Sequence, residues 1–240
     1  MGNPTLRICL WSSPRNVSTA LMYSFAQRAD TRVLDEPFYG HYLRSTGALH
    51  PGRELCLDWM RPDAESVVRE VVLAAADRPV LFLKLMGHHM GGVDWEFMAE
   101  TANVLLTRDP EQMLPSLINQ VPEPEMLDTG YEMQTRVLEH LEALGQDPPV
   151  RDSRRLLLEP EATLRKLCER LGIEFDPAMM SWPAGPKDFD GPWAPFWYHN
   201  LHKSTGFGAY RAKTEPFPER LRPLLEECRP HYQRLLERAI

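Results

Sequence analysis

The chain has 240 residues, of which 43% are hydrophobic and 25% are charged, and its formal net charge is −7. These values are typical of a folded globular protein with a large core, and the acidic balance argues against a dedicated nucleic-acid binder, although a local basic cluster can still hold a small anion. No apolar stretch approaches the ~18 residues that cross a bilayer, and no signal peptide is visible, so we expect no membrane partner.

The amino-terminal part of the chain predicts two strands and two helices. The strands cover residues 5–11 and 31–37, and the helices cover residues 18–29 and 62–77. The strands are apolar runs and the helices carry apolar residues at helical spacing. Asn16 or Ser18 can cap the first helix, Pro37 ends the second strand, and Pro62 or Asp63 starts the second helix. Residues 40–61 show no clear period and are predicted to form loop and irregular helix.

The rest of the chain continues the alternation of strands and helices. Strands are predicted at 79–86 and 102–109, with a short one from residue 150, and helices at 109–120, 131–145, 160–171 and 218–239. Pro115 predicts a kink in its helix, Gly145 and Gly172 end theirs, and a break is expected near Pro230. Residues 176–218 hold many prolines and most aromatic residues, and we predict a long irregular segment.

Strands that alternate with helices indicate an α/β fold, with an open, mostly parallel sheet flanked by helices. We find no repeat or low-complexity linker, and therefore predict one domain over residues 1–240. Ligands of such sheets bind beyond the carboxyl ends of the strands. Polar residues gather at these ends: Ser12 to Thr19, Glu36, His88, His89 and Arg108.

The turn SSPRNVST, residues 12–19, joins the first strand to its helix. The amino terminus of a helix presents unpaired N–H groups to an anion. Ser18 and Thr19 add hydroxyl donors, and Arg15 can hold an oxyanion with two parallel N–H bonds. The turn therefore suits a phosphate or sulfate group, although it lacks the spacing of nucleoside triphosphatases and also fits a polar turn with a good cap.

A second motif, LLTRDPEQMLPSL, follows the fourth strand. Arg108 leaves the strand, and Ser116 lies two turns into the next helix, so the two can jointly hold another phosphate. The alternative is an ordinary strand-to-helix junction in which Asp109 caps the helix. After the fourth strand, where a carboxylate ligand of Mg²⁺ would be expected, the sequence has the cation Arg108 instead.

Together these motifs resemble the sulfotransferase family that uses 3′-phosphoadenosine 5′-phosphosulfate (PAPS). SSPRNVSTALM resembles the family's 5′-phosphosulfate loop, with Arg15 at a place often held by Lys, and TRDPEQMLPSL resembles its 3′-phosphate motif. LLLEPEATLRKLCERLGIEF resembles a later family segment. GPWAPFWYHNLHKSTGF resembles the end of a bacterial and plant branch that is sometimes fused to aminotransferases.

The resemblance implies a P-loop NTPase-like three-layer sandwich and transfer of a sulfuryl group from PAPS to a hydroxyl or amine. PAPS is the implied donor co-substrate. No metal is implied, because its transferred end is a monoanionic sulfate rather than a triphosphate. The implied donor-binding residues are Ser13, Arg15, Asn16, Val17, Ser18, Thr19, Arg108 and Ser116. Arg15 would also stabilise the phosphate leaving group.

The late basic loop of the family has a weaker counterpart in HKSTGF. The resemblance assigns Lys203, Ser204, Thr205 and Gly206 to binding of the 3′-phosphate, although these residues differ from the family's usual Arg-Lys-Gly motif. The aromatic run Trp193, Phe196, Trp197 and Tyr198 could line an acceptor pocket or form a lid, but we predict core packing or cover for a subunit contact.

The acceptor needs a general base within hydrogen-bonding distance of its proton. Many cytosolic members use a His two residues after a Lys at the end of the third strand. Here Lys84 is present as a catalytic candidate, but Met86 occupies the position of that His. We favour Glu36 as the base, as in several carbohydrate and bacterial branches, with His88 second. The alternatives are a structural ion pair of Glu36 with Arg15 and an ordinary loop histidine.

Two other functions stay open from the sequence. The chain could be a degenerate P-loop protein that binds a nucleotide without turnover, or a nucleotide kinase or hydrolase on the same sheet. The expected partner is a small-molecule acceptor, and the oligomeric state, including a homodimer, is open. Four scattered cysteines without a Cys-x-x-Cys pair indicate buried free thiols and a cytoplasmic protein.

Overall fold

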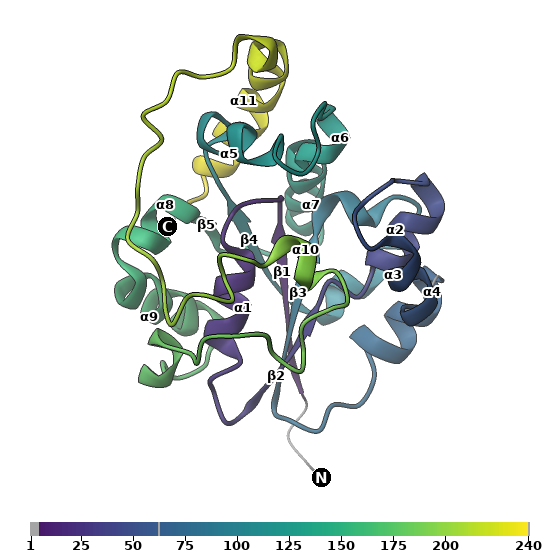
Figure 1. The fold of residues 1–240 in the computed structure, drawn as a ribbon. Coiled ribbons are helices and arrows are strands. Elements are labelled where there is room, and N and C mark those ends of the chain that lie inside the picture. Colours follow the sequence, from purple (N-terminus) through teal and green to yellow (C-terminus); the bar gives the residue numbers. More distant parts are fainter. Residues whose placement is uncertain (1–4, 62, 240) are drawn as a thin grey trace.

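The computed structural model describes residues 5–61 and 63–239 and contains an open five-stranded sheet (Figure 1). The strands are β1 (Leu6–Ser12), β2 (Thr31–Asp35), β3 (Val80–Met86), β4 (Ala102–Thr107) and β5 (Val150–Asp152). Their order is β2-β3-β1-β4-β5, and every neighbouring pair is parallel. The predicted parallel sheet is confirmed, including its short last strand.

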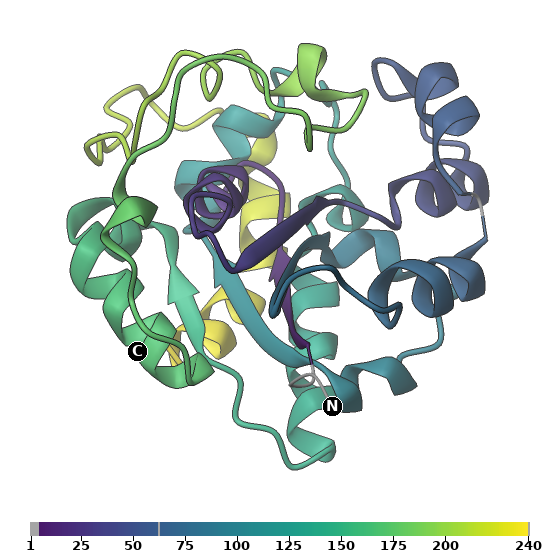
Figure 2. The same ribbon diagram turned by 90° about the horizontal axis from the view of Figure 1, so that it is seen from below.

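Helices cover both faces of the sheet, which makes three layers (Figures 1 and 2). One face packs against α1 (Ser18–Phe25), α8 (Ser153–Leu158) and α9 (Pro160–Leu171), and the other against α4 (Ala64–Val67) and α7 (Tyr131–Ala143). Along β1, Ile8 and Leu10 join the first core, whereas Cys9 and Trp11 join the second. Strands buried on both faces must be apolar at every position, which explains their continuous runs.

The remaining helices surround this sandwich. They are α2 (Tyr39–Thr46), α3 (Arg53–Trp59), α5 (Pro110–Leu117), α6 (Met126–Thr129), α10 (Ala194–Trp197) and α11 (Arg222–Leu236). The segment predicted as loop and irregular helix thus contains two short helices. Asp63 caps α4 by accepting a hydrogen bond from the Ser66 N–H, but the chain then forms a π-helical turn over Val68–Val72, so the helix predicted to residue 77 ends early.

The predicted break near Pro230 is wrong, because α11 runs unbroken through this residue. A proline inside a helix removes one N–H and displaces the carbonyl four residues earlier, here that of Glu226. Both Pro230 and Glu226 are exposed, so water can bond the freed carbonyl. On the other side of the helix, buried Leu225 and Cys228 pack with α5 residues and hold it in place.

The long segment between α9 and α11 is largely irregular, as predicted, and it covers the carboxyl ends of the strands. In Figure 1 its light green part, which includes α10, crosses in front of β1 and β3. Within the described ranges, no helix is long and apolar enough to span a membrane.

Candidate active site

The carboxyl ends of β1, β2, β3 and β4 open onto a cavity of about 400 Å³. Most of the residues that the sequence pointed to line this cavity: Arg15, Asn16, Val17, Ser18, Thr19, Glu36, Lys84, His88, Arg108, Ser116, Ser204 and Gly206. Three others, Ser13, Lys203 and Thr205, are not among its lining residues. Residues from distant parts of the sequence therefore meet in one cavity.

The loop between β1 and α1 has an unusual backbone. Arg15 and Val17 have φ angles of 59° and 64°, in the left-handed region that β-branched residues rarely adopt. Such strain persists only where the surroundings fix the chain. Here the Asn16 side chain donates to the Leu106 carbonyl at 2.6 Å, and the Ser153 hydroxyl donates to the Asn16 carbonyl at 2.7 Å. The loop is thus held against the sheet by Leu106 in β4 and by Ser153, which directly follows β5.

Asn16 also forms a hydrogen bond at the start of α1. Its Oδ1 accepts a hydrogen bond of 3.2 Å from the N–H of Ser18, while Val17 occupies the cap position without a side-chain bond. Neither of the two predicted residues occupies the cap position, although Asn16 supplies the acceptor for the first N–H of the helix. Ser18 and Thr19 line the cavity.

The two predicted anion motifs meet at their arginines. Arg15 Nε donates to Ser116 Oγ at 3.1 Å, and Arg108 Nη1 donates to the Arg15 carbonyl at 2.6 Å. Burial lowers the pKa of both guanidinium groups, and the charge of Arg108 lowers that of Arg15 further. In the described part of the chain neither arginine forms an ion pair with a carboxylate. Two adjacent half-buried cations that form no such ion pair make a strong anion site.

Lys213 is a third cation near the two arginines, although it does not line the cavity, and the sequence analysis missed it. Burial and the positive charges of Arg108 and Arg15 lower the pKa of Lys213, and its backbone N–H donates to Gln112 Oε1 at 2.9 Å. Lys203, which the resemblance pointed to, is exposed. The signal for Lys213 was the short basic stretch YRAK, which follows HKSTGF by a few residues.

Lys84 lies at the centre of a buried polar cluster at the carboxyl ends of β2 and β3. Its Nζ donates to Asp35 Oδ1 at 2.9 Å, to Glu36 Oε1 at 2.5 Å and to the Tyr198 hydroxyl at 2.7 Å. Burial disfavours the ammonium, but Asp35 and Glu36 outweigh this effect and raise the pKa of Lys84 well above its ordinary value. Lys84 is therefore charged, and it takes the ion-pair partner that was considered for Arg15.

Glu36 has one engaged and one available carboxylate oxygen. Its Oε2 lies 4.0 Å from His89 Nδ1, too far for a hydrogen bond, and receives none from the described residues. Burial raises the pKa of Glu36 despite the nearby Lys84. Its backbone φ is 42°, so Glu36 is the third non-glycine residue with a left-handed backbone in the described chain, and all three line the cavity.

His88 and His89 occupy a 3₁₀ turn that directly follows β3. Both side chains are buried, and their Nδ1 atoms lack a hydrogen-bond partner. Burial lowers the pKa of His88 to about 3 and that of His89 well below its ordinary value. Both rings are thus neutral near pH 7, and His89 stacks on Tyr39 and Tyr42 at centroid distances of 5.0 and 4.6 Å.

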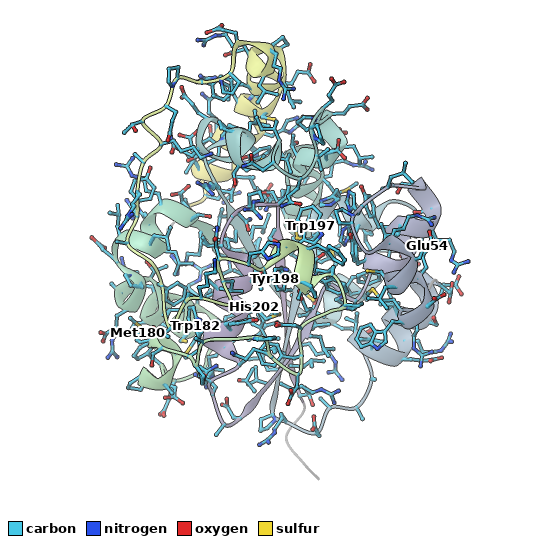
Figure 3. All side chains as sticks on the ribbon, in the orientation of Figure 1. Glu54, Met180, Trp182, Trp197, Tyr198 and His202 are labelled. Atoms are coloured by element: carbon cyan, nitrogen blue, oxygen red, sulfur yellow. The ribbon has the colours of Figure 1, made fainter. Side chains whose placement is uncertain are left out.

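Aromatic rings form the rest of the cavity wall. The predicted core packing of the late aromatic run is confirmed for Trp193 and Tyr198, which are buried in one cluster with Tyr39. These rings also line the cavity, together with Trp197 and His50. Figure 3 shows Trp197 and Tyr198 side by side at the centre of the molecule, where the late segment crosses the sheet.

Three further cavity or cluster residues escaped the sequence analysis. They are Asp35, Tyr39 and His50. Asp35 stands next to Glu36 at a strand end, which was a readable signal. His50 belongs to the segment without a clear period, and Tyr39 directly precedes that segment. No group of three or more His, Cys, Asp or Glu side chains in residues 5–61 and 63–239 is arranged to hold a metal ion.

Comparison with known proteins shows which family the chain resembles. A family model described as a sulfotransferase domain matches residues 6–239. The branched-chain-amino-acid aminotransferase-like protein 2 of Arabidopsis thaliana is 40% identical over 223 residues, which cover 92% of this chain and 40% of that protein. The chain thus spans 40% of the length of the curated relatives it matches.

Solved structures with the same fold are more distant in sequence. A sulfotransferase from Alicyclobacillus acidocaldarius gives a TM-score of 0.56 at 12% identity, over 97% of this chain and 95% of that one. The sulfotransferase domain of the Synechococcus PCC 7002 olefin synthase gives 0.53 at 17% identity, over 95% of each chain. These likenesses show a common fold.

Proposed function

The chain belongs to the sulfotransferase domain family, and on that premise we propose that it transfers a sulfuryl group from PAPS to a hydroxyl or amine of a small acceptor. The observation that carries the proposal is the junction of Arg15, Arg108 and Ser116 at one end of a cavity whose other end holds Glu36. The anion site follows β1 and β4 and the carboxylate follows β2, with β3 between β2 and β1, and both lie in the lining of one space. Donor and acceptor of a group transfer need such an arrangement.

The donor would lie along the positive end of the cavity. The N–H groups at the start of α1, with Ser18 and Thr19, suit the 5′-phosphosulfate, because they present donors and a partial positive charge. Arg108, Ser116 and Lys213 suit the 3′-phosphate. A nucleotide with negative charge at both ends would supply the ion-pair partner that the guanidinium groups of Arg15 and Arg108 lack among the described residues.

Glu36 is the base that the surroundings favour. A carboxylate with a raised pKa is a better proton acceptor than an ordinary one, and its Oε2 is free to face the acceptor. His88 is neutral, but a pKa of about 3 makes it a weak base. Glu36 would take the acceptor proton as the acceptor oxygen or nitrogen bonds to sulfur and the sulfur–oxygen bond to the nucleotide phosphate breaks.

Arg15 would stabilise the negative charge that develops on the departing phosphate. Lys84 has a different part in this proposal. An ammonium has three N–H donors, and Asp35, Glu36 and Tyr198 accept all of them. It therefore orients Glu36 rather than binding the sulfate.

The acceptor end of the cavity favours an uncharged molecule with a ring or apolar body. Tyr39, Trp193 and Trp197 provide flat apolar walls, and burial lowers the pKa of His50, which keeps this ring neutral as well. An acidic acceptor would meet Glu36 without a free cation beside it. The four cysteines are all buried and unpaired, which suits a cytoplasmic protein in a reducing environment.

Thermal unfolding with 3′-phosphoadenosine 5′-phosphate tests the donor half of the proposal. We expect this nucleotide to raise the melting temperature and Arg15→Ala to remove the rise, since a ligand that binds only the folded state stabilises it. No shift at millimolar nucleotide would contradict the proposal. A shift without transfer to any acceptor in a broad panel would instead support a binding protein without turnover.

A further inference from the structure

Tyr198 lies on the late irregular segment (Figure 3) and brings its hydroxyl into the cluster around Lys84. Its oxygen accepts from Lys84 Nζ at 2.7 Å and from Trp193 Nε1 at 3.0 Å, and its O–H donates to Asp35 Oδ2 at 2.7 Å. A phenol has one donor and two acceptor positions, and all are used here. The ring is 7% exposed, so water does not compete freely for these bonds.

These bonds close a ring of contacts. Lys84 bonds one oxygen of Asp35, and Tyr198 bonds both Lys84 and the other oxygen of Asp35. The ammonium therefore has a fixed orientation, with its third N–H aimed at Glu36 Oε1. This leaves Oε2 as the free oxygen of Glu36, the atom that faces the acceptor in the function proposed above.

The segment that carries Tyr198 also borders the donor end of the cavity. Ser204 and Gly206 line the cavity, and the segment is folded on itself by a hydrogen bond of 2.7 Å from the Gly185 N–H to the His202 carbonyl. Asp190, from the same segment, accepts the Tyr23 hydroxyl of α1 at 2.6 Å. One stretch of chain thus contributes to both ends of the cavity.

We propose that Tyr198 is a positioning residue for sulfuryl transfer, and that its hydroxyl fixes Lys84 and thereby the free oxygen of Glu36. The inference rests on the proposed function. Without the hydroxyl, Asp35 loses one hydrogen-bond donor and attracts the Lys84 ammonium more strongly. The hydrogen bond from Lys84 to Glu36 is therefore weakened. The base would then be present but poorly oriented, and proximity and orientation carry a large part of such catalysis.

The test compares Tyr198→Phe with wild type and with Tyr23→Phe, a control that removes another phenol-to-carboxylate bond of the same segment without touching Lys84. Transfer is measured from PAPS to whichever of benzyl alcohol, phenol, a hexose or an alkylamine gives the highest rate. We expect kcat of Tyr198→Phe to fall about 10- to 100-fold, the effect of losing a hydrogen bond to a charged group, while nucleotide binding stays within about twofold.

The pH profile separates positioning from a merely structural effect. The titratable groups around Glu36 are Lys84, Asp35, His89, Tyr39, Cys56 and Tyr198. The variant removes the Tyr198 hydroxyl and weakens the interaction of Lys84 with Glu36, and the other groups stay unchanged. Because Glu36 loses part of its positive partner, the acidic limb of kcat should move to higher pH in Tyr198→Phe and stay in place in Tyr23→Phe. Trp193→Phe removes the indole donor to Tyr198 together with part of the aromatic wall, and it should lower kcat in the same direction by a smaller factor.

Each possible result supports or overturns the positioning role of Tyr198. An unchanged kcat and limb in Tyr198→Phe, with an active wild type, would overturn the positioning role and leave the proposed function intact. Equal losses in Tyr198→Phe and Tyr23→Phe would reduce Tyr198 to an anchor of the segment. If Tyr198→Phe does not fold, an unaltered kcat in Trp193→Phe overturns the inference. A wild type that binds nucleotide but transfers no sulfate to any of the acceptors overturns both proposals.

Discussion

Arg15 and Ser116 are 101 residues apart in sequence, yet the guanidinium Nε of one donates a hydrogen bond of 3.1 Å to the hydroxyl of the other. The contact joins the loop after β1 to the helix after β4, and these strands are neighbours in the sheet. Parallel neighbours bring their following loops together at one edge. The bond therefore follows from the strand order, and it fixes the distance between the two anion-binding segments.

The cation that completes this site is predicted to be Lys213. Lys213→Ala should weaken binding of 3′-phosphoadenosine 5′-phosphate about 10-fold or more, as expected for loss of one charge-assisted hydrogen bond. Lys203→Ala is the matched control, because Lys203 is exposed, whereas Lys213 is half-buried and its pKa responds to the charges of Arg108 and Arg15. Isothermal titration of both variants measures the effect. A larger loss of affinity in Lys203→Ala than in Lys213→Ala would return the assignment to the HKSTGF loop.

Glu36→Gln should lower kcat by about 10²- to 10⁴-fold, the usual contribution of a general base. The amide keeps the shape of the side chain and still accepts a hydrogen bond from Lys84, so nucleotide affinity should change little. Single-turnover rates at saturating donor provide the measurement. His88→Gln is the comparison, and a larger loss in that variant would make His88 the base.

Acid should destabilise the protein partly through His88. This histidine is neutral in the folded state because burial lowers its pKa to about 3, whereas the unfolded chain takes up a proton near pH 6.5. The unfolded state thus binds more protons between these values, so the contribution of His88 is fully present above pH 6.5 and is lost as the pH falls toward 3.

Melting temperatures between pH 7 and pH 4 check this prediction. The wild type should lose stability more steeply than His88→Gln, at up to about 1.4 kcal/mol for each pH unit in this window. The raised pKa of Glu36 acts in the opposite direction, because its folded form holds a proton more readily than the unfolded chain. Since Glu36 is present in both proteins, the difference between their slopes isolates His88. Equal slopes would mean that the His88 ring is not held neutral.

The aromatic wall should select for uncharged acceptors. Benzyl alcohol should be sulfated with a kcat/KM at least about 10-fold above that of mandelate, whose carboxylate would lie near Glu36 without a partner. Trp197→Ala should raise the acceptor KM and leave nucleotide affinity unchanged, because Trp197 lines the aromatic end of the cavity. Initial rates with both alcohols measure this, and a preference for mandelate would contradict the assigned polarity.

The sequence predicted the sheet and its ligand edge well, because apolar strands and polar turns obey local rules. Arg15, Glu36 and Arg108 were found from their positions at strand ends and Lys84 from the family resemblance, and all line one cavity. What failed depended on long-range contacts. Pro230 lies on an exposed helix side whose opposite side is anchored, and no local pattern reveals that anchor.

The late segment was the hardest part to predict. Its irregular backbone has no period, so the sequence could not indicate that Tyr198 reaches Lys84 across 114 residues or that Lys213 faces the arginines. The pairing of Glu36 was also ambiguous. A strand-end carboxylate can meet either Arg15 or Lys84, and only the register of β2 against β3, in which Asp35 lies opposite Lys84, decides between them.

The buried thiols allow the opening of the protein core to be measured by chemical labelling. Burial raises the pKa of Cys9 to about 12 and those of Cys56 and Cys228 to about 11, so almost no thiolate forms near neutral pH. Alkylating dyes would therefore label these sulfurs only as fast as the core opens. The labelling rate would therefore measure the rate at which the core opens. This measurement needs neither an engineered probe nor a known acceptor.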